Sequence, residues 1–322
     1  MISINTGIEI IMNDWLSVKK DELIHFISDE NHIKEIEAFT KFTSKTDSTL
    51  RITVLQSHQV QNGNVIEEMT SSFKDDDVII GATDFSFITT SAVTKAIKNG
   101  SRFLSLPLSC TNNTSLLEND FIKMDPKIAY DDAQKILKKL KGKDTIHVTT
   151  KLGTDLTFSI KDRIPGYFNG CATKPGQIGS ASFEAYIAPL ENSMNGVLYL
   201  DGSFGYLGTV KKPIKIEFVN GKLVNAESED DGAKKLLDYI KSFNDEKMYK
   251  PGEFGIGLNR KSKCRGICYI EDESTYSTFH IGMGRNITLG GKQKAAGHFD
   301  IVTHKPTIEA GKTTIMKNGE LI

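Results

Sequence analysis

The segment over residues 77–106 constrains the fold more than any other part of the chain. Residues 77–82 form a nearly continuous apolar run, which is typical of a parallel strand that is buried on both faces. A helical pattern follows over residues 91–98 and ends at Asn99-Gly100, and residues 102–106 begin another strand. Strand, helix and strand in this order form a β-α-β unit, so residues 1–125 are predicted to form an α/β domain.

The chain before this unit is less regular. Residues 20–42 carry apolar side chains at helical spacing, at Leu23, Ile24, Phe26 and Ile27, and predict a helix. Residues 51–55 predict a strand. The domain contains neither a Gly-x-Gly-x-x-Gly turn nor a Gly-Lys-Ser/Thr loop, which argues against nucleotide binding as its leading role.

The character of the chain changes in the second half. A helix over residues 131–140 leads into short β-rich runs separated by glycine turns, and Asn220-Gly221 is a strong signal for a hairpin. One further helix is predicted over residues 232–243. Residues 126–322 are therefore predicted to form a β-rich, α+β domain that is partly barrel-like and binds metal.

Composition excludes several classes of function. The 322 residues carry a net charge of -1, so no basic excess indicates nucleic acid. The sequence shows no basic leader, no cationic amphipathic stretch and no long apolar run, so we expect a cytoplasmic protein without membrane contact. Four scattered cysteines predict plain thiols rather than a disulfide scaffold.

His298-Phe299-Asp300 carries the clearest chemistry. Side chains alternate along a strand, so His298 and Asp300 are expected to point to the same face. An imidazole nitrogen and a carboxylate oxygen side by side make half of a metal site. His280, on another predicted strand, is a candidate third ligand.

Acidic residues add to this pattern. Glu184 and Glu253 each interrupt apolar or glycine-rich segments, and Glu271-Asp272-Glu273 precedes His280. A glutamate in a strand usually faces water, so each position alone is weak. Together, three acidic segments and two histidine-bearing strands suit one or two divalent metals held by oxygen and imidazole ligands.

These segments resemble the thermophilic metallo-aminopeptidase (aminopeptidase T) family in their order along the chain, and the resemblance covers most of the sequence. Six segments carry it: residues 153–158, 183–189, 252–259, 271–273, 279–284 and 297–300. Residues 82–107 are similar to the N-terminal domain of the same family.

The resemblance implies both a site and an activity. Carried over by position, the metal ligands are Glu184, Glu253, His280, His298 and Asp300, which would bind one or two zinc, cobalt or manganese ions. The implied activity is an aminopeptidase-like hydrolase that releases N-terminal residues from small peptides by metal-activated water, with Glu253 or Glu273 moving the proton. A homodimer is also implied. Ile287 stands where these peptidases have a tyrosine, which counts against peptidase activity.

Two alternatives remain open. The dihydroxypyridine ring-cleaving dioxygenases are a similar branch of the same fold, and His280, His298 and Asp300 would then hold a single Fe(II) and act on a small molecule. The scaffold could instead belong to a non-catalytic or biosynthetic accessory protein. His25, His32, His58 and His147 are interpreted as ordinary surface or helix residues, and His304 as a strand-end residue in solvent.

Overall fold

The computed structural model describes residues 1–57, 64–73 and 76–322. The chain divides into two compact units, of which the first comprises residues 1–127 and 168–182 and the second residues 128–167 and 183–322. The sequence-based division at residue 125 treated both domains as continuous, whereas the chain returns to the first unit over residues 168–182. A division of this kind leaves no local signal, because the returning segment is short.

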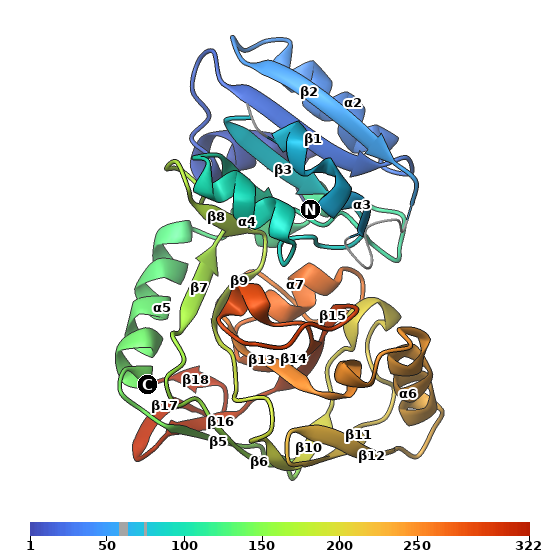
Figure 1. The fold of residues 1–322 in the computed structure, drawn as a ribbon, viewed down its shortest axis with the longest axis vertical. Helices are drawn as coiled ribbons and strands as arrows, with labels where there is room; N and C mark the ends of the chain where they lie inside the picture. The colour runs from blue at the N-terminus through green and yellow to red at the C-terminus, as the bar shows by residue number, and fades with distance from the viewer. Residues whose placement is uncertain (58–63, 74–75) are drawn as a thin grey trace. The chain divides into compact units, whose positions relative to one another are not determined.

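The first unit contains a parallel five-stranded sheet in the order β2-β1-β3-β4-β8 (Figure 1). Its strands are β1 (Leu23–Asp29), β2 (Thr49–Leu55), β3 (Val78–Ala82), β4 (Arg102–Ser105) and β8 (Ile178–Ser180). Its α-helices are α1 (Ile4–Glu9), α2 (Ile33–Thr43), α3 (Asn64–Glu68) and α4 (Ser91–Lys98). The predicted α/β class is confirmed for this part of the chain.

The prediction of a helix over residues 20–42 is wrong for the first half of this segment. Leu23–Asp29 is the strand β1, which pairs in parallel with both β2 and β3, and only Ile33–Thr43 is helical. A central parallel strand is apolar on both faces, so its residues also match a helical spacing by chance. Pairing on both sides decides the conformation, and pairing is not visible locally.

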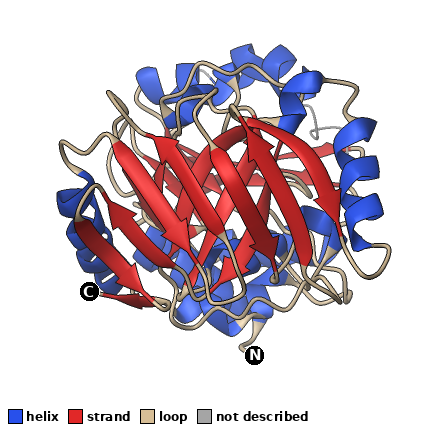
Figure 2. Cartoon of the chain, turned by 90° about the horizontal axis from the view of Figure 1, so that it is seen from below, coloured by secondary structure: helices blue, strands red, loops and turns tan. Residues whose placement is uncertain are grey.

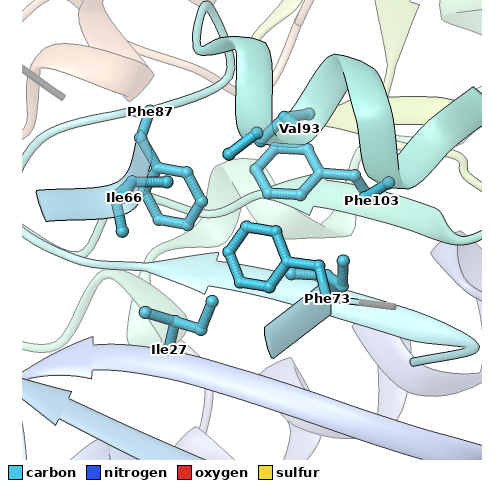
Figure 3. Close-up of a cluster of buried hydrophobic side chains, with 9 residues drawn as sticks. Ile27, Ile66, Phe73, Phe87, Val93 and Phe103 are labelled. Carbon is cyan, nitrogen blue, oxygen red and sulfur yellow. The ribbon is translucent and has the colours of Figure 1, made fainter. Parts of the chain in front are cut away.

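A hydrophobic cluster lies between this sheet and its helices. Ile27, Phe73, Phe87, Val93 and Phe103 are almost completely buried in it, and the rings of Phe87 and Phe103 meet edge to face at 5.4 Å (Figure 3). Thr90 caps α4 by accepting a hydrogen bond from the Val93 backbone N–H, which fixes where this helix begins.

The second unit is built on two antiparallel sheets, and the predicted β-rich class is confirmed. The larger sheet has the order β12-β11-β10-β6-β5-β16-β17-β18, with the carboxyl-terminal strands at one edge (Figure 2). Its strands are β5 (Thr145–Thr149), β6 (Asp155–Ser159), β10 (Asn195–Leu200), β11 (Ile214–Val219), β12 (Lys222–Glu227), β16 (Thr307–Ala310), β17 (Thr313–Lys317) and β18 (Glu320–Leu321). Asn220 and Gly221 both have positive φ and form the predicted hairpin turn.

The smaller sheet has the order β15-β14-β13-β9-β7. Its strands are β7 (Gly166–Asn169), β9 (Phe183–Ile187), β13 (Pro251–Gly257), β14 (Thr278–Gly284) and β15 (His298–His304). Helices α5 (Pro126–Leu140), α6 (Gly232–Ser242) and α7 (Tyr269–Ser274) complete the unit (Figure 1). Among the described residues, no helix combines the length and apolar character that crossing a membrane requires.

Candidate metal centre

All five predicted metal ligands lie on one face of the smaller sheet. Strand pairing shows this directly, because residues opposite one another in an antiparallel pair point to the same side. Glu253 lies opposite Gly282, which in turn lies opposite Asp300. The same face carries Glu184 on β9, His280 on β14 and His298 on β15, opposite Gly257, Gly255 and Gly284 respectively.

Glycines make room for the two imidazole rings. A β-carbon on Gly255 would lie 1.9 Å from Nε2 of His280, and one on Gly282 would lie 2.6 Å from Cε1 of His298. Each ring therefore lies over the backbone of the neighbouring strand, in space that any other residue would fill. The glycines are part of the site although they offer no ligand atom.

The ligand atoms form two groups that share one residue. Glu184, Glu253 and His280 form one group and Glu253, His298 and Asp300 the other, with ligand atoms within 4.8 Å of one another in each. His280 Nε2 lies 2.8 Å from Glu184 Oε2, and His298 Nε2 lies 3.1 Å from Glu253 Oε2. Glu253 therefore links the two histidines.

A backbone contact sets the orientation of the His298 ring. Its Nδ1 lies 2.8 Å from the carbonyl oxygen of Arg285, which can only accept a hydrogen bond. The Nδ1 position must then carry the proton, and Nε2 faces Glu253 and Asp300. This arrangement is the usual way in which a protein fixes the tautomer of a metal-ligating histidine.

Burial and mutual charge shift the pKa of most groups at the site. Burial and the neighbouring Glu184 raise the pKa of Glu253 to about 7. Burial also raises the pKa of Asp300, but His298 and His280 outweigh it and hold that pKa at about 2. Burial lowers the pKa of His280, yet the Glu184 carboxylate more than compensates and raises it to about 9. Without a metal, carboxylates and imidazolium rings neutralise one another here.

The donor set fits a bound metal ion. Glu253 Oε1, Glu273 Oε2 and Asp300 Oδ1 are buried acceptors without a hydrogen-bond donor among the described residues. His280 Nδ1 is likewise buried without a partner. Several buried acceptors without donors are costly unless a proton or a cation satisfies them, and carboxylate oxygen with imidazole nitrogen is a common ligand set for divalent metals.

Glu273 lies beside the ligands, and its two neighbours do not. Burial, followed by the charges of Asp300 and Glu184, raises the pKa of Glu273 well above its ordinary value. Glu271 instead pairs with Arg265 at 2.8 Å, and Asp272 accepts backbone hydrogen bonds from the loop before α7. Of the acidic segment, Glu273 is thus the member that reaches the candidate centre.

The interpretation of the other histidines needs correction. His25 is buried with Nδ1 2.7 Å from Asp76, and His32 is buried with Nε2 2.9 Å from Asp84, so neither is a surface residue. Each pairs with an aspartate distant in the sequence, which no local pattern shows. His147 is partly exposed beside Asp155, as expected, and His58 lies outside the described residues. His304 is the last residue of β15 and is partly exposed, with its Nδ1 3.2 Å from Asp201.

The four cysteines are free thiols, as predicted.

One residue on the ligand face was not found from the sequence. Tyr186 lies on the ligand face of β9, two residues after Glu184, and the strand parity of Glu184 could have identified it. Ile287, at the position of the peptidase tyrosine, is 40% exposed and lies in a short 3₁₀ turn (Ile287–Leu289) outside the sheet.

Comparison with known proteins identifies the family. The family model of 2,5-dihydroxypyridine 5,6-dioxygenase (NicX) matches residues 31–322. A 2,5-dihydroxypyridine 5,6-dioxygenase from Pseudomonas putida is 25% identical over 208 residues, which span 60% of this chain and 59% of that protein.

Two solved structures share the fold over nearly the whole chain. The structure of 2,5-dihydroxypyridine dioxygenase from Pseudomonas putida has a TM-score of 0.76 and 18% identity. The match covers 99% of this chain and 96% of the dioxygenase chain. AmpT from Thermus thermophilus has a TM-score of 0.62 and 13% identity, and the match covers 99% of this chain and 98% of AmpT. The resemblance to aminopeptidase T is therefore one of fold.

The predicted aminopeptidase-like hydrolase activity is wrong. The matching family model and the curated relative are both dioxygenases, and the likeness to AmpT extends only to structure. Similar ligand types at similar positions led to the peptidase interpretation, because one scaffold can host different chemistries. This chain belongs to the 2,5-dihydroxypyridine 5,6-dioxygenase (NicX) family.

Proposed function

We propose that this chain is a ring-cleaving dioxygenase that uses one Fe(II) ion and acts on a dihydroxylated pyridine. The family match supports the reaction class. The observation that carries the proposal is the placement of His280, His298 and Asp300 on one face of the smaller sheet.

Two histidines and one carboxylate are the ligand set of non-haem iron oxygenases, in which Fe(II) keeps open positions for substrate and dioxygen. In this chain His298 and Asp300 alternate along β15, and His280 lies on the adjacent strand β14. The Arg285 carbonyl holds Nε2 of His298 toward the other ligands. The chain thus presents the three donors from two neighbouring strands of a rigid sheet.

The two glutamates would serve as proton acceptors beside the metal. Glu184 and Glu253 lie 2.8 Å from His280 Nε2 and 3.1 Å from His298 Nε2 respectively. A substrate hydroxyl bound on this face lies within reach of both carboxylates, which can accept its proton as the ring is activated. Their burial excludes water that would otherwise compete for that position.

Oxygen consumption tests the proposal. The full chain, loaded with Fe(II) under anaerobic conditions, is mixed with oxygenated buffer and 2,5-dihydroxypyridine in an oxygen electrode. We expect dioxygen uptake in equal amount to substrate and a product heavier by both oxygen atoms. His298→Ala should abolish uptake, whereas His147→Ala, at a partly exposed site on the larger sheet, should not. An iron-loaded wild-type chain that consumes no dioxygen would contradict the proposal.

We also propose the homodimer that the family resemblance implies. Light scattering on the full chain after size exclusion measures the mass directly. A mass equal to one chain across the concentrations used for the oxygen assay would rule the dimer out.

A further inference from the structure

The second unit has a cavity of about 560 Å³ where strands of its two sheets end, apart from the metal centre. None of the five metal ligands is among the described residues that line it. The residue of β15 that does so is His304, four positions after Asp300. Four residues of a strand extend about 13 Å, so the cavity is a separate site. Its volume lies within the range of pockets that hold small organic molecules.

Two lysines of the cavity are available to a ligand. Lys151 lies in the turn between β5 and β6, and Lys305 lies in the turn between β15 and β16. Both side chains are exposed, and neither ammonium group forms an ion pair or a hydrogen bond with any residue that the structure describes. An ammonium group offers three donors and no acceptor, so these two positions suit a ligand that carries negative charge.

The carboxylates of the same cavity already have donors within the protein. Asp201 Oδ1 accepts a hydrogen bond from the backbone N–H of His304 at 2.9 Å and lies 3.2 Å from Nδ1 of its ring. Glu320 Oε2 accepts the hydroxyl of Tyr276 at 3.3 Å. The acidic groups are thus used to hold the walls, and the uncommitted charge in the cavity is positive.

The backbone of the cavity wall is unusual at three positions. Ser277, Lys305 and Asn318 line the cavity and have φ values of 71°, 48° and 48°, in the left-handed region. Glycine and asparagine adopt this conformation most readily, whereas lysine and serine rarely do. The Lys305 N–H donates to the Ser277 carbonyl at 2.8 Å, which joins two of the turns. A lysine kept in a costly conformation points to a use for its side chain at this place.

We propose that this cavity binds a small organic oxyanion, a dicarboxylate or a phosphate ester, through the ammonium groups of Lys151 and Lys305. Lysine binds carboxylate and phosphate as a point charge. The side chains of Ser277 and Asn318, which form no hydrogen bond with any described residue, offer neutral donors beside the lysines. The cavity is several times larger than an inorganic anion, so a ligand with a carbon skeleton fits it better. The proposal does not depend on the proposed dioxygenase function.

Isothermal titration calorimetry on the full chain tests whether the cavity recognises charge. The chain is titrated with succinate, with glycerol 3-phosphate and with succinamide, which is the neutral diamide of succinate. We expect binding of at least one of the two anions and none of succinamide at the same concentrations. The anion that binds more tightly distinguishes a carboxylate site from a phosphate site. Binding of neither anion, or equal binding of succinamide, would overturn the proposal.

Two lysine variants place the binding in this cavity. Lys305→Asn removes the charge but suits the positive φ, so it should weaken binding of the preferred anion roughly tenfold or more without lowering the melting temperature of the free protein. Lys151→Gln should weaken binding to a similar extent. Lys312→Gln is the matched control, since this exposed lysine lies beyond the other end of β16 and does not line the cavity. Wild-type affinity in both Lys305→Asn and Lys151→Gln would overturn the proposal.

A variant of the metal centre separates the two sites. His298→Ala should bind the preferred anion as tightly as the wild type, because His298 does not line the cavity. Loss of binding in His298→Ala would place the anion at the metal centre and overturn the proposal of a separate site. The readout is binding rather than dioxygen uptake, so either result leaves the test of the dioxygenase function unchanged.

Discussion

Gly255 and His280 lie directly opposite one another on β13 and β14, and the imidazole ring occupies the space where a side chain of residue 255 would be. The ring can therefore lie flat against β13, close to Glu184 and Glu253. A metal centre on a pleated sheet needs such cleared positions, because side chains from adjacent strands stand only ~5 Å apart.

Gly255→Ala should lose metal while the fold persists. The added methyl would lie 1.9 Å from His280 Nε2, so the ring must rotate away from its partners. We expect iron content after anaerobic loading to fall to a small fraction of the wild-type value, measured by elemental analysis. Gly142→Ala is the control, since φ is positive there but the new methyl meets no atom. It should cost about 1 kcal/mol of stability and no metal. Full metal content in Gly255→Ala would show that metal binding does not need the space that Gly255 leaves for the His280 ring.

His298→Ala and Asp300→Asn should each reduce metal affinity by at least tenfold, because each removes one donor from a buried group. Competition with a chromogenic chelator measures the change. His304→Ala lies on the same strand and face, beyond the ligands, and should retain wild-type affinity. If His298→Ala holds metal as tightly as the wild type, the ligand assignment fails.

Asp132 should stabilise the protein in a pH-dependent manner. It contacts Lys135 Nζ at 2.8 Å and Arg260 Nη2 at 2.5 Å, and although burial raises its pKa, these two cations lower it overall. A carboxyl with a lowered folded-state pKa stabilises the fold above its unfolded pKa, near 3.8, and loses that contribution as the pH falls through the folded value.

Asp132→Asn should therefore lower the free energy of unfolding by about 1 kcal/mol at neutral pH, since both cations are partly exposed. Urea denaturation at a series of pH values should show the difference from wild type shrinking below pH 3.8. Glu229→Gln, at an exposed pair with Lys212, should show no such difference. A constant difference across the series would exclude an electrostatic origin.

Phe103→Ala should destabilise the first unit strongly. Phe103 is fully buried in the cluster of Figure 3, and removing its ring leaves a cavity that typically costs about 3–5 kcal/mol. Trp15 is the single tryptophan and is buried in the same unit, so its fluorescence reports the unfolding of that unit during denaturation. Val54→Ala, at an exposed position of β2, should change stability by less than about 0.5 kcal/mol.

Much of the candidate centre follows from strand parity. Alternation places His298 beside Asp300. Glu184 alone was a weak signal, and its contact with His280 is a finding of the structure. The same parity places Tyr186 on the ligand face, two residues after Glu184. In β1, by contrast, the sequence pattern gave a wrong prediction of a helix. A strand that is buried on both faces has no polar side, so the two-residue period of a strand is not visible in its sequence.

The two classes of domain and the residue types of a metal centre could be predicted from the sequence, because both depend on local periodicity and on side-chain chemistry. Tertiary structure alone decided which residues meet. Pairing of β9, β13, β14 and β15 brings together ligands from position 184 to position 300, and glycines opposite the histidines clear the space between them. Cross-strand register has no local signature, since it results from hydrogen bonds between segments that are far apart in the chain.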